Sequence, residues 1–368
     1  MKKNNILGRI LILVIIIAAV IMWDFKFKNA IGKEGLIITK WDNFYNGDNI
    51  HFYYLNPQNE NLLKIKAKYG INKLIDNKAD QLENSIKIMK FINENVKAKS
   101  TSMTSDKTTL EIMEVAFAGG EISDSDYVAM YEECLASVGI NARRGILRST
   151  DNKVKGKSYF NVSEIWSDKY KKWIMIDGVN AQYMKQDGIP LGAVEIINIG
   201  IEKVEIQELK NASKYIKNMR SYYESYSIYI DNNKYGELKS NSQITYLKVK
   251  QLPKIETKEG FTQPTIFVNN SKVFNISPKI QYENTGKDKD PTIILAKRDL
   301  KNDTKEVQNF TVGAFINSYM LTDYFISVNS ADYIKVDTFY ELQIVEGINS
   351  IKLSQDGKNL SKEIVIEK

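Results

Sequence analysis

The sequence predicts an α+β fold, because helical and strand patterns occupy different parts of the chain. Apolar residues recur at helical spacing between residues 79 and 138, and strand-like segments follow as far as residue 177. Beyond about Ile230 the period changes to two, in short stretches separated by Asn, Gly and Asp. We therefore expect a helix packed on an antiparallel sheet, followed by an all-β region.

Residues 1–33 are expected to form a membrane anchor. Ile10 to Trp23 carry no charge and are rich in Ile, Leu and Val, and the flanking residues are basic. A cleaved signal peptide is the alternative, although no small-residue cleavage site follows. As an uncleaved signal anchor, this segment would hold the protein in the cell membrane by a single pass, with the main body extracytoplasmic.

Charge and reactive-residue counts argue against several functional classes. Residues 1–33 hold six basic residues against one acidic residue, so they account for +5 of the formal net charge of +6. The nearly neutral remainder lacks the electrostatic footprint of a nucleic-acid-binding protein, so we expect no nucleic-acid partner. Cys134 and His51 are the only cysteine and histidine. No internal disulfide can form, structural zinc has too few ligands, and we expect no cofactor.

The first predicted helices have recognisable starts and ends. A helix is expected from Ala79, with apolar residues on one face: Leu82, Ile86, Met89, Ile92 and Val96. Thr108 and Glu111 form a capping-box pattern for a shorter helix that ends at Gly119. A further helix is expected near residues 211–223, after a turn at residues 188–191.

The helix after Gly119 is the most informative. Asp124 or Ser125 can cap it, and Gly139 ends it. Its apolar stripe consists of Tyr127, Tyr131, Cys134, Leu135 and Val138. Three strand-like segments follow this helix: Arg144–Thr150, Tyr159–Trp166 and Trp173–Asp177.

The C-terminal part reads as a β-sandwich-like domain over residues 236–368, after a first domain over residues 34–235. Its predicted strands are Ile244–Val249, Thr265–Val268, Thr292–Leu295, Tyr333–Val336 and Ile364–Ile366. Residues 345–351, followed by Gln355-Asp356-Gly357, are similar to the last hairpin of an immunoglobulin-like sandwich. We therefore expect an all-β, immunoglobulin-like arrangement here.

Four short motifs occur in order between residues 124 and 177. They are Asp124-Ser125-Asp126-Tyr127, Gly139-Ile140-Asn141-Ala142-Arg143, Ser163-Glu164-Ile165-Trp166 and Lys172-Trp173-Ile174-Met175-Ile176-Asp177. Together they resemble the core of the transglutaminase-like superfamily, over about residues 62–200. The resemblance implies a papain/transglutaminase-like core. Residues 188–191 with Glu195 resemble a segment of bacterial envelope members, and the Asn-, Lys- and Ile-rich composition favours a Gram-positive bacterium.

The resemblance also implies where a catalytic triad would lie. In that family a cysteine at the helix start, a strand histidine and a strand aspartate act together. The corresponding positions here are Asp124, Phe160 and Asp177. A carboxylate at a helix start is stabilised in its charged form and is a poor nucleophile, and phenylalanine has no titratable proton. We therefore expect no catalytic residue at these positions and a protein that is a pseudoenzyme.

Other residues are weak substitutes for the missing pair. Cys134 lies ten residues into the helix, about 15 Å from Asp124 along its axis, and falls on the apolar stripe. His51 lies in an aromatic N-terminal segment, and Ser123 and Ser125 have no identifiable base. A carboxylate cluster of Asp124, Asp126, Asp177 and Glu164 would suit Ca²⁺ if it converged, whereas solvated carboxylates are the simpler expectation.

Three functions stay open at this point. The first is a membrane-anchored, non-catalytic protein that binds a peptide, a protein or a cell-wall ligand. The second is a peptidase, amidase or protein-crosslinking enzyme with a displaced site, which needs two carboxylates within about 5–10 Å in one cleft. The third is a structural or adhesion protein that acts through its C-terminal β domain.

Overall fold

The computed structural model describes residues 36–47, 50–99, 106–149, 158–208, 211–248, 263–280, 288–298 and 307–368. The predicted anchor at residues 1–33 lies outside the described residues. Within these ranges, no helix is both long enough and apolar enough to cross a bilayer. The described chain mixes helices with large sheets, which agrees with the α+β prediction at that level.

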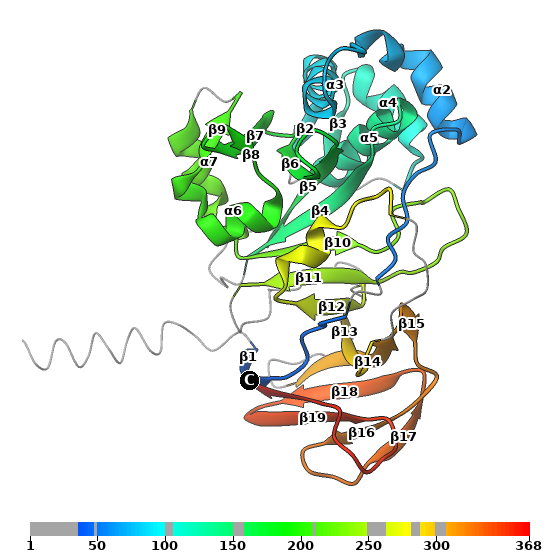
Figure 1. Cartoon of the computed structure of the whole chain (residues 1–368), viewed down its shortest axis with the longest axis vertical. Helices are drawn as coiled ribbons and strands as arrows, with labels where there is room; N and C mark the ends of the chain where they lie inside the picture. The colour runs from blue at the N-terminus through cyan, green and yellow to red at the C-terminus, as the bar shows by residue number, and fades with distance from the viewer. Residues whose placement is uncertain are drawn as a thin grey trace, which may run out of the picture.

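One helical layer precedes the main sheet in the chain and lies at the top of Figure 1. It consists of α2 (Glu60–Tyr69), η1 (Ile71–Leu74), α3 (Gln81–Asn95), α4 (Thr109–Phe117) and α5 (Asp124–Ser137). Two short strands, β2 (Lys97–Lys99) and β3 (Glu121–Ser123), pair in parallel beside it. The predicted capping box of Thr108 and Glu111 is present at the start of α4. The helices at residues 79–96 and 124–138 are confirmed within a few residues.

The middle of the chain forms the upper part of a long sheet with a second helical layer. Its strands are β4 (Ala142–Arg148), β5 (Tyr159–Ser167), β6 (Lys172–Asp177), β7 (Gln182–Gln186), β8 (Ile189–Pro190), β9 (Glu205–Gln207) and β10 (Ser225–Tyr229). The second layer contains α6 (Ala193–Ile199), η2 (Ile201–Lys203), α7 (Ala212–Met219) and η3 (Arg220–Tyr222), on the left of Figure 1.

The C-terminal part continues this sheet and adds a second one. The first sheet is extended by β11 (Gln243–Leu247), β12 (Thr265–Val268), β13 (Thr292–Arg298), β14 (Val307–Ile316), β15 (Tyr319–Met320) and β18 (Tyr340–Val345). The second sheet contains β1 (Ile37–Trp41), β16 (Asp323–Val328), β17 (Ile334–Asp337), β19 (Ile348–Ser354) and β20 (Lys362–Glu367). The short helix η4 (Ser271–Asn275) follows β12.

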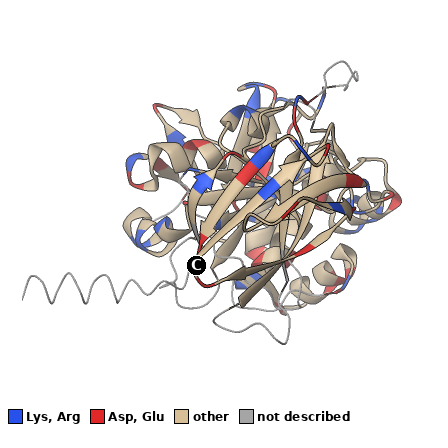
Figure 2. Cartoon of the chain, turned by 90° about the horizontal axis from the view of Figure 1, so that it is seen from below, with Lys and Arg blue, Asp and Glu red and all other residues tan. Residues whose placement is uncertain are grey.

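The long sheet separates two hydrophobic cores, because successive strand residues point to opposite faces. On β5, Phe160 and Val162 pack in the core beneath α6 and α7. Ile165 packs in the other core, together with residues of α3, α4 and α5. Seen from below in Figure 2, Lys and Arg are interspersed with Asp and Glu over the described ribbon.

The lower part of the molecule is two sheets packed face to face. Phe310 and Val312 of β14 share a core with Ile351 of β19 and Ile364 of β20. The last hairpin is β19–β20, and Asp356 lies in its turn. Residues 345–351 form no hairpin, because β18 pairs with β14 and β19 pairs with β16 and β20 in the other sheet.

The predicted domain boundary, between residues 235 and 236, falls in the connection between two paired strands, so the sheet continues across it. β10 lies before the boundary and β11 after it, and the two strands pair over five residues on each side. The N-terminal strand β1 pairs with the C-terminal strand β20, beside the label C in Figure 1. Residues 37–41 therefore lie in the C-terminal sheet rather than in the helical part.

Candidate functional site

The start of α5 differs from the prediction by one residue. Ser123 is the N-cap, and its side chain accepts a hydrogen bond from the backbone N–H of Asp126 at 3.0 Å. The Asp126 carboxylate accepts in return from the Ser123 backbone N–H at 3.4 Å. The prediction of Asp124 or Ser125 as the cap is therefore wrong, because a serine one position earlier completes a capping box. Asp124 is the first helical residue.

The Asp124 carboxylate is occupied by the neighbouring strand. Its Oδ2 accepts hydrogen bonds from the backbone N–H and from the side-chain Nδ2 of Asn161, each at 3.1 Å. The Asp124 side chain is 0% exposed. These bonds join the first turn of α5 to β5, a structural use of the carboxylate.

The structure brings Asp124 together with Asn161 and turns Phe160 away. Phe160 belongs to the core on the α6 side of the sheet, where its ring centroid lies 6.2 Å from that of Tyr222. Because neighbouring strand residues face opposite ways, Asn161 points to the α5 side when Phe160 points to the α6 side. Phe160 therefore lies on the strand that bonds to Asp124, whereas the side chain that makes this bond belongs to Asn161, one residue further along.

Asp177 is equally enclosed. It accepts hydrogen bonds from the backbone N–H of Asn180 at 3.0 Å, from its side chain at 2.8 Å and from the Tyr215 hydroxyl at 2.8 Å. Burial raises the pKa of Asp177 above its ordinary value, although these hydrogen bonds act in the opposite direction. Gly178 is so close to Tyr127 of α5 that an added Cβ would lie 2.3 Å from the ring.

The other candidates do not assemble into a catalytic or metal site. Cys134 is buried, and burial raises its thiol pKa, as expected for a core residue. The backbone N–H of His51 donates to Ser318 at 3.3 Å, far along the chain from the α5 residues. Asp124 and Asp177 have the partners given above, and Asp126 completes the capping box with Ser123. Within the described ranges, no group of three His, Cys, Asp or Glu side chains is placed to hold a metal ion.

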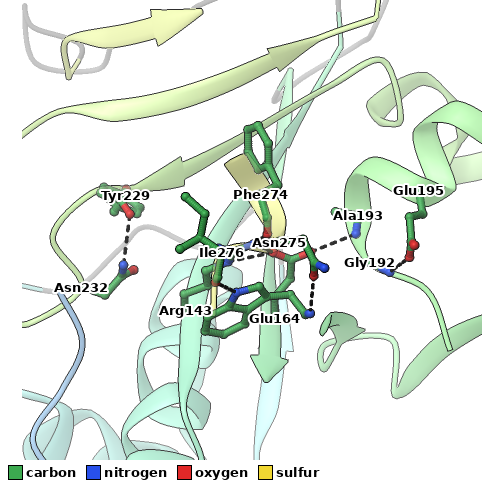
Figure 3. A network of polar contacts seen from close by, with 11 residues as sticks. Arg143, Glu164, Gly192, Ala193, Glu195, Tyr229, Asn232, Phe274, Asn275 and Ile276 are labelled. Atoms are coloured by element: carbon green, nitrogen blue, oxygen red, sulfur yellow. Dashed lines mark hydrogen bonds and ion pairs between the residues drawn. The ribbon is translucent and has the colours of Figure 1, made fainter. Parts of the chain in front are cut away.

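A buried ion pair lies further along β5. The Arg143 guanidinium donates from Nε and Nη2 to Oε2 of Glu164, at 2.9 and 2.6 Å, and both side chains are almost fully buried. The other oxygen of Glu164 accepts from the backbone N–H of Ala193 at 2.9 Å. Figure 3 shows Glu164 between Arg143 and the start of α6. Both carboxylate oxygens of Glu164 are therefore engaged.

Trp173 links this ion pair to η4. The Arg143 guanidinium carbon lies 4.1 Å from the Trp173 ring centroid, in cation–π geometry. The indole N–H of Trp173 donates to the Ile276 carbonyl at 2.8 Å, and its backbone N–H donates to Asn275 Oδ1 at 3.1 Å. Arg143 also donates to the Phe274 carbonyl. A segment that follows β12 is thus fastened to β4 and β6.

A solvent-accessible pocket of about 210 Å³ lies where β6, α6 and η4 meet. Its lining combines aromatic walls with charged and amide groups: Glu164, Lys172, Trp173, Gly192, Val194, Glu195, Ser271, Lys272, Phe274 and Asn275. The Lys172 ammonium pairs with the Glu195 carboxylate, which also accepts from the Gly192 backbone N–H at 2.8 Å. This pocket lies beside three of the residues that carry the resemblance, Glu164, Lys172 and Trp173.

Sequence reasoning missed the pocket. It identified Glu164 and Trp173 as motif residues with structural roles and noted Glu195 within a motif. No pattern in residues 271–275 indicates that they lie beside β6, because that contact joins segments about 100 residues apart. The aromatic and basic character of this short stretch was the available signal.

Comparison with known proteins adds no assignment. No protein-family model matches the chain, and a search of curated proteins finds no match. A functional conclusion for this chain therefore rests on its residues and their geometry.

Proposed function

We propose that the chain is a membrane-anchored, extracytoplasmic protein with a transglutaminase-like core that binds a peptide, protein or cell-wall ligand without catalysing its turnover. In this proposal residues 1–33 are the anchor, and the two-sheet C-terminal part is an immunoglobulin-like domain. The order of helix, Gly-Ile-Asn-Ala-Arg turn and three antiparallel strands supports the core assignment.

The observation that carries the proposal is the state of the triad positions. Asp124 and Asp177 are both 0% exposed and bonded to neighbouring side chains, and Phe160 is packed in a core. A nucleophile must reach its substrate, and a general base must share a proton within hydrogen-bond distance. The three positions supply neither a thiol nor an imidazole, and their carboxylates are used to join α5, β5, β6 and α7.

The test is an activity assay on the full-length chain with amide-hydrolysis and amine-incorporation substrates. We expect no turnover above a protein-free blank, while an active transglutaminase-like enzyme in parallel validates the substrates. Turnover that disappears in Asp124→Asn would contradict the proposal, because this variant keeps an oxygen acceptor for Asn161. Binding is measured separately, as retention of the chain on immobilised wall fragments.

One observation favours a second candidate, an enzyme with a displaced carboxylate pair. Oxygens of Glu164 and Glu195 lie 3.4 and 3.7 Å from the point where a Cβ on Gly192 would sit, and both residues line the pocket. Arg143 pairs with Glu164 and Lys172 pairs with Glu195, so both carboxylates already have ionic partners, which favours a binding role over a catalytic one. Turnover lost in Glu195→Gln and kept in Asp124→Asn would establish this candidate instead.

A further inference from the structure

The pocket between β6, α6 and η4 has a floor that is fixed before any ligand arrives. Arg143 is bonded to Glu164, as Figure 3 shows. Trp173 contacts Arg143 and bonds to the segment at the end of η4, as described above. These groups are buried, so they keep their positions and offer preorganised walls. A pocket with a fixed floor and an exposed rim is suited to recognise a small chemical group.

The charged groups of the described residues around the pocket comprise two ion pairs and one further cation. Glu164 is neutralised by Arg143, and Glu195 is paired with Lys172. Among the lining residues, all within the described part of the chain, Lys272 is the cation with no carboxylate partner. Its side chain is exposed at the rim. The remaining positive charge favours an anionic group on the ligand.

The other lining groups favour a peptide-like ligand over a bare anion. Trp173, Phe274 and Val194 form apolar walls that suit a small side chain. The Asn275 side-chain oxygen accepts a hydrogen bond from the Trp173 backbone N–H. The N–H₂ group of Asn275 is then the part of this side chain that can donate to a ligand at the pocket mouth. A volume of about 210 Å³ is below that of pockets for drug-sized ligands, so it fits one residue rather than a longer segment.

We propose that this pocket recognises the C-terminal residue of a peptide, with Lys272 pairing with the terminal carboxylate and Trp173 and Phe274 enclosing the side chain. The proposal rests on the proposed binding function and specifies its ligand class. It also separates the binding site from the triad positions, of which Asp177 lies at the other end of β6.

The experiment titrates N-acetylalanine into the full-length chain and follows binding by saturation-transfer NMR. We expect a dissociation constant on the order of 1–10 mM, typical of a ligand this small. N-acetylalaninamide, which lacks the charge, should bind at least about fivefold more weakly. Lys272→Gln should weaken binding of the acid about threefold or more.

Lys279→Gln is the matched control, since Lys279 is an exposed lysine that follows the same short helix and pairs with Asp168 outside the pocket. Its affinity for N-acetylalanine should be unchanged. The proposal would be overturned if N-acetylalanine did not bind, or if the acid and the amide bound equally well. It would also be overturned if Lys272→Gln bound N-acetylalanine as tightly as the wild type. Inorganic phosphate that competes as well as the acid would also overturn it, in favour of a general anion site.

The same samples separate this proposal from the proposed function. Ammonia released from N-acetylalaninamide by the wild-type chain and lost in Asp124→Asn would contradict the non-catalytic function, whatever the affinities. Failure of carboxylate recognition without ammonia release would remove the ligand class and leave the non-catalytic function intact.

Discussion

The two ends of β6 differ in what surrounds them. At Asp177 the strand ends in a closed corner, where the Tyr215 hydroxyl of α7 donates to the Asp177 carboxylate, and on the neighbouring strand β5 Asn161 donates to Asp124 of α5. At Lys172 and Trp173, about 13 Å away along the strand, an ion pair and an indole line an open pocket. One strand thus carries a closed corner at one end and an accessible pocket at the other.

This difference shows why residue identity and exposure have to be considered together. A carboxylate such as Asp177, which is desolvated and bonded on several sides, stabilises a fold and is withdrawn from substrate. A carboxylate such as Glu195, whose side chain is 45% exposed beside Lys172, can still exchange partners with a ligand. Buried motif residues such as Asp177 therefore stabilise the fold, whereas exposed residues such as Glu195 are available to bind a ligand.

The largest effect is expected from Arg143→Ala at the open end. Removing the guanidinium leaves Glu164 buried without its ionic partner, and it releases the Phe274 carbonyl of η4. We expect a loss of about 3–5 kcal/mol in the free energy of unfolding, measured by urea denaturation. Lys279→Ala, which breaks an exposed pair with Asp168, should cost less than about 1 kcal/mol. Equal effects of the two substitutions would mean that the pocket floor is not a fixed element.

A smaller effect is expected at the closed end from Asp124→Ala. The substitution leaves the buried Asn161 backbone N–H without the acceptor described above. Unfolding free energy should fall by about 1–3 kcal/mol in urea denaturation. Asp124→Asn retains an acceptor oxygen and loses mainly the interaction with the helix dipole, so its cost should be about 1 kcal/mol or less. Two variants of equal stability would contradict the structural use of this carboxylate.

The smallest effect is a pH dependence at the closed end. Because burial raises the folded-state pKa of Asp177 above its unfolded value of about 3.8, the folded chain holds the proton more tightly. The Asp177 contribution to stability is therefore greatest at low pH and falls as pH rises through the interval above 3.8. The difference in unfolding free energy between wild type and Asp177→Asn should shift in favour of the variant as pH rises from 4 to about 7. A difference that stays constant with pH would contradict the raised folded-state pKa of Asp177.

Local patterns predicted much of the fold. The capping box at Thr108, the helix that ends before Gly139 and the strand Thr265–Val268 were read from neighbouring residues alone. The cap of α5 was misplaced because Ser123, Asp124 and Ser125 are all good cap residues, and the choice depends on which one Asp126 can bond in return.

Long-range pairing could not be predicted in the same way. The pattern at Ile364–Ile366 predicts a strand, whereas nothing in that segment indicates that residues 37–41 are its partner. The docking of η4 on β6 has the same origin, since Asn275 and Ile276 contact Trp173 across about 100 residues of chain. The pocket combines both cases. Its lining residues Glu164, Trp173 and Glu195 belong to motifs that the sequence shows, whereas nothing in the sequence places the lining residues of η4 beside them.

Thiol alkylation tests the contrast between the two ends most directly. In separate full-length variants, Asp124→Cys places a thiol in the closed corner and Ser271→Cys places one at the pocket rim, with buried Cys134 as an internal reference. Site-resolved mass spectrometry after iodoacetamide treatment at about pH 8 compares native and urea-unfolded rates. We expect the rim thiol to react nearly as fast in both states and the corner thiol to react at least about a hundredfold more slowly in the native state. A corner thiol that reacts as fast as the rim thiol in the native chain would contradict the account, because it would mean that an open, catalytic-like cleft exists at Asp124.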